Sequence, residues 1–539
     1  MKKEYNGIIN KEPFPPKDID LYSGEPIPVP YLDNPPSVID ITVGRQLFVD
    51  DFLIEKADGV KVVQHNPIKR KEPVLVPETD AEKKFGMHFV GTNSGGLIYD
   101  GKKTKLYYQG SWLGQLCLAE SDDGINFTRP CVKNGDNVVL NCDLVEFGKD
   151  GIEFNELTDE QFDELAKSVR ACKSEDDMRK IKPHIFRMDS GTVIYDENSE
   201  EERYKFYYRN PGVPFPAYLA TSPDGINWNK FNITPVVEDR STAFYNPFRN
   251  KWVYSIRWWY RELDGKDGKK DIGRSRNYAE SDNFLDNYKK EDQVMWYTAD
   301  KLELEDENLK IKPQIYNIDA VAYESLMVGI AISFKGPDNI TCLSQSRPKT
   351  NDLCLMFSRD GFHWSRLTRE PFIKASRDEN LWDNGYLMSV GGLFAVDDDE
   401  IRVYYTGTQG DSKKPYDPWL TGMHANGSIG LATLRRDGFA SISGKGSFVT
   451  RKLIFTENRD RLRVNFKGKV KCEIYLDGKI YASGEAEGDF VSREILSGLS
   501  ELKNKEITIK FTLDGDLYSF WFTDSTGKAY GYINQRKEI

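Results

Sequence analysis

The sequence is poor in the side chains that most often bind metals. It has only five histidines and seven cysteines in 539 residues, and it contains no Cys-x-x-Cys pair and no His-Glu-x-x-His stretch. The cysteines are scattered and odd in number, which is typical of reduced thiols and not of a disulfide framework or a zinc site. We therefore expect no metal bound by histidine and no other cofactor.

Further absences exclude whole classes of partner. The net charge is −11, so the chain lacks the basic excess that favours nucleic-acid binding. No apolar run is long enough to cross a bilayer. The first residues, MKKEYNGIINKEPFPPKDID, have a basic start but no apolar segment like that of a signal peptide. We expect a cytoplasmic protein, or a secreted one whose leader has been removed, with neither a nucleic-acid nor a membrane partner.

Aromatic and β-branched residues are abundant, and they recur in a repeated pattern. Residues 191–228 hold three runs rich in Val, Ile, Tyr and Phe, and end in Ser-Pro-Asp-Gly-Ile-Asn-Trp. Degenerate copies cover residues 93–127, 241–284, 317–364 and 390–439. Each copy supplies three strands and a linking strand, with apolar residues alternating on the flanks. Five such copies predict a five-bladed β-propeller.

An Asp-Gly pair near the end of three copies predicts a tight turn, because glycine adopts positive φ without strain. The aromatic residue that follows each pair is expected to pack between blades. We interpret these residues as structural: Asp123-Gly124 with Phe127, Asp224-Gly225 with Trp228, and Asp360-Gly361 with Trp364.

The segments outside the copies predict the rest of the fold. Residues 1–40 are rich in Pro and Asp and indicate an extended arm. Residues 45–78 indicate two outer strands, which could complete the last blade and close the ring. An insertion at about 143–182 contains a helix signal, with Thr158 as N-cap and Gln161 in a capping box.

After residue 440 the pattern changes to clean alternation with an Asp477-Gly478 hairpin turn, which predicts a β-sandwich. The expected fold is therefore all-β. A propeller over 41–440, with the small helical insertion, is followed by a sandwich over 441–539.

A propeller places the starts of its innermost strands around a central funnel, so polar residues there can converge on one ligand. Aligning the copies on a shared tyrosine brings acids or amides to that position. Crowded carboxylates raise one another's pKa, so that one stays protonated as an acid while another is ionised. Glycoside hydrolysis needs this division of labour. The candidates are Asn93, Asp189, Asp239, Asp319, Glu324 and, before the last copy, Asp383.

Glu324 has two interpretations. Aligned on Tyr323, it falls on a turn position that other copies fill with Asp100, Asp196 or Asn246. However, the residues after it run straight on as a strand, so Glu324 could instead open an inner strand.

Other residues are candidates for substrate contact or for positioning the acids. Arg240 adjoins Asp239 and could pair with it. Aromatic side chains can stack on sugars, and histidines can donate hydrogen bonds to them. The remaining candidates are His88, Trp258, Trp259, Trp382 and His424.

With these patterns in place, the chain resembles the five-bladed propeller glycoside hydrolases. These include the arabinanase and arabinofuranosidase group of family 43, the invertase and fructanase group of family 32, and the mannoside phosphorylases. It is most similar to bacterial glycosyl-hydrolase-like proteins through LFVDDFLIE, DGINFTRP, WDNGYL and IGLATLRRDGF. The resemblance implies that Asp189 and Asp319 serve as nucleophile, base or supporting carboxylate, and that Glu324 is the acid.

Three functions follow as hypotheses. The leading one is a glycoside hydrolase that removes a terminal sugar, such as a furanoside, by two-carboxylate chemistry. A glycoside phosphorylase would need a cluster of Arg, Lys or His in the funnel to hold phosphate. A carbohydrate-binding propeller without catalysis would use the acids only to bond sugar hydroxyls. In each case an oligosaccharide or glycoside is the expected partner.

Overall fold

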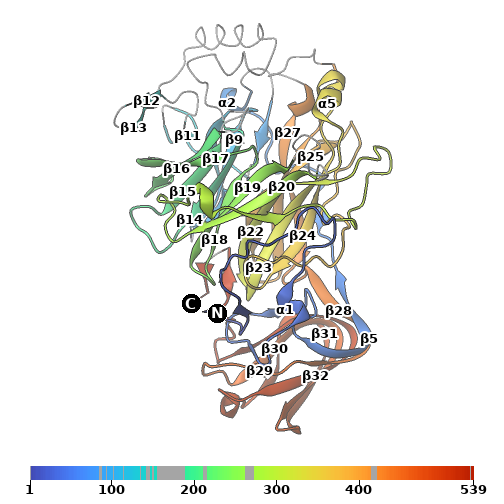
Figure 1. The fold of residues 1–539 in the computed structure, drawn as a ribbon. Helices are drawn as coiled ribbons and strands as arrows, with labels where there is room; N and C mark the ends of the chain where they lie inside the picture. Colours follow the sequence, from blue (N-terminus) through green and yellow to red (C-terminus); the bar gives the residue numbers. More distant parts are fainter. Residues whose placement is uncertain are drawn as a thin grey trace.

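The chain is nearly all β in the computed structural model (Figure 1). The structure describes residues 2–83, 88–92, 94–100, 102–112, 114–133, 135–140, 146–148, 151–153, 188–209, 215–260, 272–413, 422–534 and 536–538. Five β-sheets are arranged as the blades of a propeller, which confirms the expected fold class. The helix expected at Thr158 lies outside the described residues, as does the candidate Asn93.

The blades follow one another along the chain. Blade 1 contains β7 (Val90–Gly91), β8 (Leu97–Tyr99), β9 (Thr104–Gly110), β10 (Gln115–Ser121) and β11 (Val138–Leu140). Blade 2 contains β14 (Ser190–Tyr195), β15 (Tyr204–Arg209), β16 (Phe215–Ser222) and β17 (Lys230–Val237). Blade 3 contains β18 (Thr242–Asn246), β19 (Lys251–Tyr260), β20 (Gly273–Ser281) and β21 (Val294–Tyr297).

Blades 4 and 5 recruit strands from the ends of the chain. Blade 4 contains β22 (Gln314–Glu324), β23 (Leu326–Phe334) and β24 (Asn351–Ser358), with β33 (Tyr532–Ile533) and β34 (Arg536–Lys537) added beside β22. Blade 5 contains β25 (Gly385–Val396), β26 (Glu400–Thr408), β27 (Gly427–Arg435) and β6 (Ile68–Lys69).

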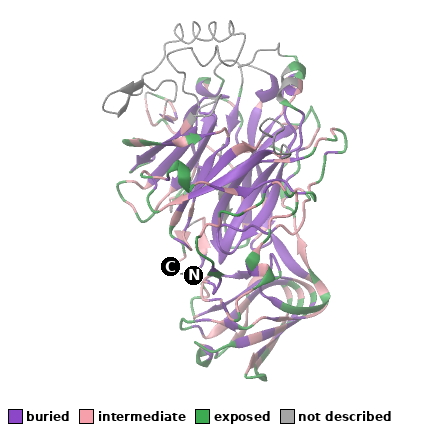
Figure 2. Cartoon of the chain, viewed as in Figure 1, coloured by how far each residue is buried: buried purple, intermediate pink, exposed green. Residues whose placement is uncertain are grey.

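Most of the inner and middle blade strands are buried on both faces because neighbouring blades pack against each other (Figure 2). Every residue of β15 and of β24 is buried. The apolar clusters lie between blades, and one of them joins Tyr107 and Leu118 of blade 1 to Phe206 of blade 2. This explains why the strands read as near-continuous runs of aromatic and aliphatic residues.

The repeated Asp-Gly turns are structural, as predicted. Asp224 accepts hydrogen bonds from the backbone N–H groups of Ile226 and Asn227 at 2.8 and 2.7 Å. Gly225 has φ +76°, and a Cβ at this position would lie 2.0 Å from the Tyr107 hydroxyl of blade 1. Glycine is therefore needed both for the turn and for the close approach of two blades.

The ring is closed by the N-terminal segment, as the sequence suggested. Lys69 of β6 pairs with Ala432 of β27, and the Lys69 ammonium lies 2.6 Å from a carboxylate oxygen of Asp383. The preceding strand, β5 (Ile54–Gln64), differs from the expectation, because it pairs with β28 of the second sheet and not with a blade.

The second sheet contains β3 (Ile39–Asp40), β4 (Gln46–Leu47), β5, β28 (Ala440–Thr450), β29 (Leu453–Ile454), β30 (Arg461–Leu476), β31 (Lys479–Ser497) and β32 (Ile507–Thr523). Phe511 and Phe520 of β32 have ring centres 5.6 Å apart, although nine residues of straight strand span about 30 Å. The strand therefore bends, at Gly515 with φ +141°. Gly515 pairs with Gly444 and Gly468, which also have positive φ. One sheet thus folds over a single core along a row of glycines.

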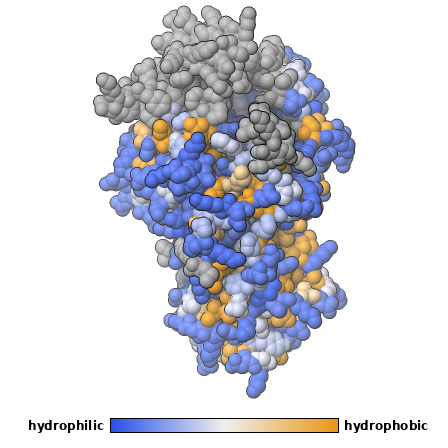
Figure 3. Space-filling view, viewed as in Figure 1, coloured by the Kyte–Doolittle hydropathy of each residue, from blue (hydrophilic) through white to orange (hydrophobic). Residues whose placement is uncertain are grey.

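The remaining elements are short. They are β1 (Lys2–Lys3), β2 (Ile9–Asn10), β12 (Glu146–Gly148), β13 (Gly151–Glu153), α1 (Pro30–Asp33), α2 (Asp80–Lys83), α5 (Asn339–Gln345), η2 (Lys290–Asp292), η3 (Gly422–His424) and η4 (Ser500–Leu502). No helix among the described residues has the length and apolar character needed to span a membrane. The face of the molecule seen in Figure 3 is mainly hydrophilic, with apolar side chains in scattered groups.

Both termini meet at the β22–β23 turn, at the junction of the propeller and the second sheet (Figure 1). Ile533 pairs with Tyr323, and the Tyr5 hydroxyl donates to the Ser325 carbonyl. Segments from both ends of the chain therefore cross the boundary expected near residue 440. We call this end of the propeller the bottom face, and the end where the innermost strands begin the top face.

Glu324 lies in this turn and not at the top face, which corrects its proposed role as the acid. Its side chain is fully buried, with Oε1 3.1 Å from Nη2 of Arg436 and 3.5 Å from Nε of Arg45. Its φ is +51°, so the turn interpretation holds. Arg45 also pairs with Asp437 at 2.9 Å. Burial alone would raise the pKa of Asp437, but the guanidinium groups of Arg45 and Arg436 hold it at about 2. This ion cluster joins blade 4 to the second sheet.

We expect Glu324→Gln to destabilise the fold by about 3 kcal/mol, because breaking the buried ion pairs removes the carboxylate paired with Arg436 and leaves Arg45 with Asp437 alone. The loss would be measured as a lower midpoint of urea or thermal unfolding. The matched control is Glu55→Gln, which removes an exposed pair with Arg451 and should change stability by less than about 0.5 kcal/mol. Equal effects of the two substitutions would contradict a structural role for the cluster.

Candidate active site

The top face gathers polar side chains from blades 2 to 5. Inner strands start there and second strands end there, because neighbouring strands are antiparallel. Asp189 immediately precedes β14, and Asp239 and Arg240 precede β18. Tyr316 lies near the start of β22, and His424 lies just before β27. Residues distant in the sequence are thus brought to one end of the ring.

Asp189 is held by an arginine of its own blade. Its Oδ2 atom lies 3.4 Å from Nη1 of Arg209, the last residue of β15. Arg209 is fully buried and Asp189 is nearly so. Burial lowers the pKa of Arg209, whereas the Asp189 carboxylate counteracts this effect. The ion pair therefore fixes the position of the Asp189 carboxylate at the start of an inner strand.

Two neighbouring acids share a second arginine. The Arg257 guanidinium forms an ion pair with Asp239 and lies 3.6 Å from Oε2 of Glu238. The Tyr316 hydroxyl donates to Oδ2 of Asp239 at 3.2 Å. Burial, together with the nearby Arg274, lowers the pKa of Arg257 to about 10. The sequence suggested Arg240 as a partner for Asp239, and the structure pairs Asp239 with Arg257.

Cations outnumber carboxylates in this cluster. The cluster contains three acids, Asp189, Glu238 and Asp239, and five cationic side chains. We call these five side chains the cationic group: Arg209, Arg240, Arg257, Arg274 and Lys349. Burial lowers the pKa of several of them, which is the expected effect of crowding like charges away from water. The top face is therefore locally positive in a protein of net charge −11.

Aromatic rings separate the cations. The Arg274 guanidinium lies 4.6 Å from the ring centre of Trp259 and 5.3 Å from that of Tyr316. His424 stacks on Trp112, with ring centres 3.5 Å apart and planes 9° from parallel. Burial, and then the charges of Lys349 and Arg240, lowers the pKa of His424 well below its usual value. His424 is therefore a neutral imidazole in this site.

Asp319 lies deeper, at the centre of the ring. Ser94, Asn317 and Ser389, from blades 1, 4 and 5, all donate hydrogen bonds to Oδ2 of Asp319. Burial raises the pKa of Asp319, while these hydrogen bonds act in the opposite direction. This carboxylate connects three blades beneath the cationic group.

The other sequence candidates take different places. Trp382 and Asp383 support ring closure, since the Trp382 indole donates to the Lys71 carbonyl at 3.0 Å and Asp383 pairs with Lys69. Trp258 neighbours Trp259 on β19, and alternation directs the two side chains to opposite faces of the blade. His88 is exposed, just before blade 1.

Several basic residues of the site are not among the candidates that the sequence predicted. The second strands of blades 2 and 3 both place an arginine near their ends, Arg209 and Arg257. A cation recurring at corresponding places in two copies was the signal available in the sequence. Lys349, which precedes β24 in a loop, gave no such signal.

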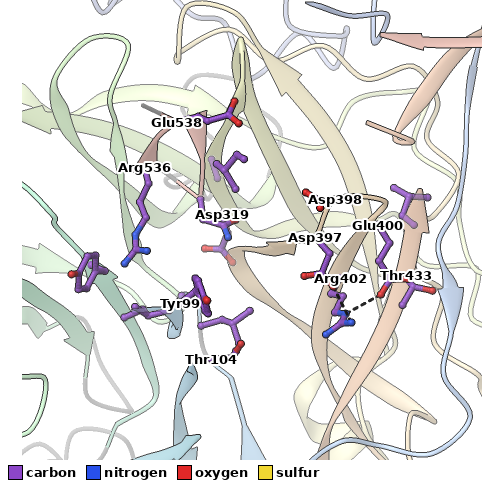
Figure 4. A pocket seen from close by; sticks show the side chains of 18 of the residues that line it. Tyr99, Thr104, Asp319, Asp397, Asp398, Glu400, Arg402, Thr433, Arg536 and Glu538 are labelled. Carbon is purple, nitrogen blue, oxygen red and sulfur yellow. Dashed lines mark hydrogen bonds and ion pairs between the residues drawn. The ribbon is translucent and has the colours of Figure 1, made fainter. Parts of the chain in front are cut away.

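A separate cavity of about 1370 Å³ lies at the bottom face (Figure 4). Asp319 borders it at the centre, and Asp397, Asp398 and Glu400 line one side. Arg402 pairs with Asp397 at 3.0 Å and with Glu400 at 2.9 Å. The acids Asp397 to Asp399 in this cavity are exposed, whereas the top-face acids are buried or half-buried among cations. We therefore place the candidate chemistry at the top face.

The chain is similar to several solved glycoside hydrolases at low sequence identity. No family model and no curated protein matches the chain. A thermostable family-43 glycoside hydrolase is 11% identical with a TM-score of 0.38, covering 66% of this chain and 94% of that one. An exo-β-1,3-galactanase from Phanerochaete chrysosporium is 10% identical with a TM-score of 0.31, covering 85% and 99%. An endo-1,5-α-L-arabinanase from Thermotoga petrophila is 9% identical with a TM-score of 0.34, covering 79% and 99%. At these values the chain is similar to them in general architecture alone.

Proposed function

We propose that the chain is a glycoside hydrolase whose working carboxylates lie at the top face of the propeller. The observation that carries the proposal is the convergence of Asp189, Glu238 and Asp239 at the starts of two adjacent inner strands. Glycosidic cleavage needs one carboxylate that stays ionised and one carboxyl group that donates a proton. Three buried or half-buried acids in one cluster can supply both.

The contacts suggest how the roles are divided. Asp189 is ion-paired with Arg209, and a carboxylate held in place in this way suits a nucleophile or a base that activates water. The proton donor is then assigned to Glu238 or Asp239, the other two carboxyl groups of the cluster. Asp319 supports the site from beneath, through its hydrogen bonds to three blades.

The shape of the ring centre bears on whether the enzyme removes a terminal sugar or cleaves within a chain. Asp319 and its hydrogen-bond partners are buried at the centre of the ring, so a sugar bound above them would meet a closed floor. A closed floor favours removal of a terminal sugar over cleavage within a chain. That this sugar is a furanoside rests only on the resemblance drawn from the sequence.

We expect Asp189→Asn and Asp239→Asn each to lower kcat/KM by about 10²- to 10⁴-fold, because each removes a group that ionises or transfers a proton. The measurement is release of the aryl group from a panel of aryl furanosides and pyranosides. Glu324→Gln is the matched control and should retain activity per folded molecule. Full activity of both Asn variants would refute the site assignment, and sugar binding without turnover by the unaltered protein would favour a carbohydrate-binding propeller.

Phosphorolysis is a second candidate, and the cationic group favours it, because arginine and lysine bind phosphate oxygens well. A hydrolase releases free sugar, and we expect inorganic phosphate to slow its reaction by occupying the cationic group. A phosphorylase would instead require phosphate and release a sugar 1-phosphate. Measuring product identity at increasing phosphate concentration separates the two. Acceleration by phosphate would overturn the hydrolase proposal.

A further inference from the structure

The members of the cationic group differ in what neutralises them. Arg209 pairs with Asp189, and Arg257 pairs with Asp239 and Glu238. Lys349 is different. Among the described residues, no carboxylate lies within ion-pair distance of its ammonium and no acceptor takes a hydrogen bond from it. Lys349 is nevertheless only 5% exposed.

A buried ammonium without a counter-charge is costly. Two aromatic faces lie near it, with the Nζ atom 5.3 Å from the ring centre of Tyr316 and 5.7 Å from that of Tyr386. Such contacts stabilise a cation by about 1–2 kcal/mol, less than the several kcal/mol that burying an ion costs. Burial and three neighbouring arginines, Arg274, Arg257 and Arg240, lower the pKa of Lys349 to about 7, while Cys342 acts in the opposite direction.

A second buried group nearby has an unsatisfied nitrogen. Within the part of the chain that the structure describes, the Nδ1 atom of His424 has no hydrogen-bond partner, and the His424 side chain is 6% exposed. The ring of Tyr386 lies 5.0 Å from that of His424. Arg240 donates to the Tyr386 hydroxyl at 3.1 Å. Nitrogen atoms of Lys349, His424 and Arg240 are therefore gathered around one tyrosine.

We propose that Lys349, Arg240 and His424 form a binding subsite for an oxyanion, a carboxylate or sulfate group carried by the sugar substrate. Neutral sugars offer only hydroxyl groups, which cannot balance the excess positive charge of this cluster. An oxyanion supplies the missing charge and accepts several hydrogen bonds at once. The assignment of this anion to the substrate rests on the proposed function, whereas the existence of the subsite does not.

The experiment is calorimetric titration of the full chain with D-glucuronate, sulfate and inorganic phosphate, with D-glucose as the neutral control. We expect D-glucuronate to bind, and Lys349→Met to weaken its binding at least tenfold. The matched control is Lys205→Met, which replaces an equally buried lysine that is ion-paired to Asp196 away from the top face and should bind as the unaltered protein does. Because an anion favours the ammonium form, affinity should be higher at pH 6 than at pH 8.5.

Each outcome has one meaning. Removing an unpaired buried charge should leave the melting temperature of Lys349→Met unchanged or raised, so loss of binding cannot be ascribed to unfolding. Tight binding of phosphate with none of D-glucuronate or sulfate supports the subsite and assigns it to free phosphate. Absence of binding by all three oxyanions, or equal binding by Lys349→Met, overturns the subsite. Anion binding without turnover of any glycoside would refute the proposed function and leave the subsite standing.

Discussion

The pairing of β6 with β27 is the contact on which the rest of the propeller depends. A ring of blades has no covalent closure, so its last blade must borrow a strand from the other end of the chain. The Lys69–Asp383 ion pair and the Trp382 indole, which packs against Gly430 and Tyr405, hold this strand in place. Residues that looked suited to sugar binding thus keep the ring shut.

The top and bottom faces of the closed ring also differ in the sign of their local charge. Cations outnumber carboxylates in the cluster at the top face, while acids such as Asp397 to Asp399 and Glu400 line the bottom cavity. The remainder of the surface carries the overall excess of acid. A potential of this kind repels anions from most of the molecule and attracts them at one place, which favours selection of charged ligands.

The features that could be predicted from the sequence are those determined by residues close together along the chain. Blades, turns and ring closure follow from alternation, Asp-Gly pairs and repeat spacing, and Asp189 and Asp239 follow from their place before inner strands. Glu324 could not be placed in the same way, because its partners Arg45 and Arg436 come from distant segments. The sequence could not tell which of Trp258 and Trp259 contacts the cationic group. That depends on the register of β19, which composition does not provide. Lys349 is noteworthy only for the partner it lacks, and that is visible only in three dimensions.

The long-range pairing of β5 has a consequence during synthesis on the ribosome. Its partner β28 emerges only after blade 5, which at usual translation rates is a delay on the order of tens of seconds. Until then β5 is an unpaired strand in a crowded cell. Its sequence, IEKADGVKVVQ, carries Glu55, Lys56, Asp58 and Lys61, and charges at such spacing discourage strands from pairing with other chains. The charged side of β5, which is exposed in the finished fold, thus also protects this strand from wrong pairing until β28 has been synthesised.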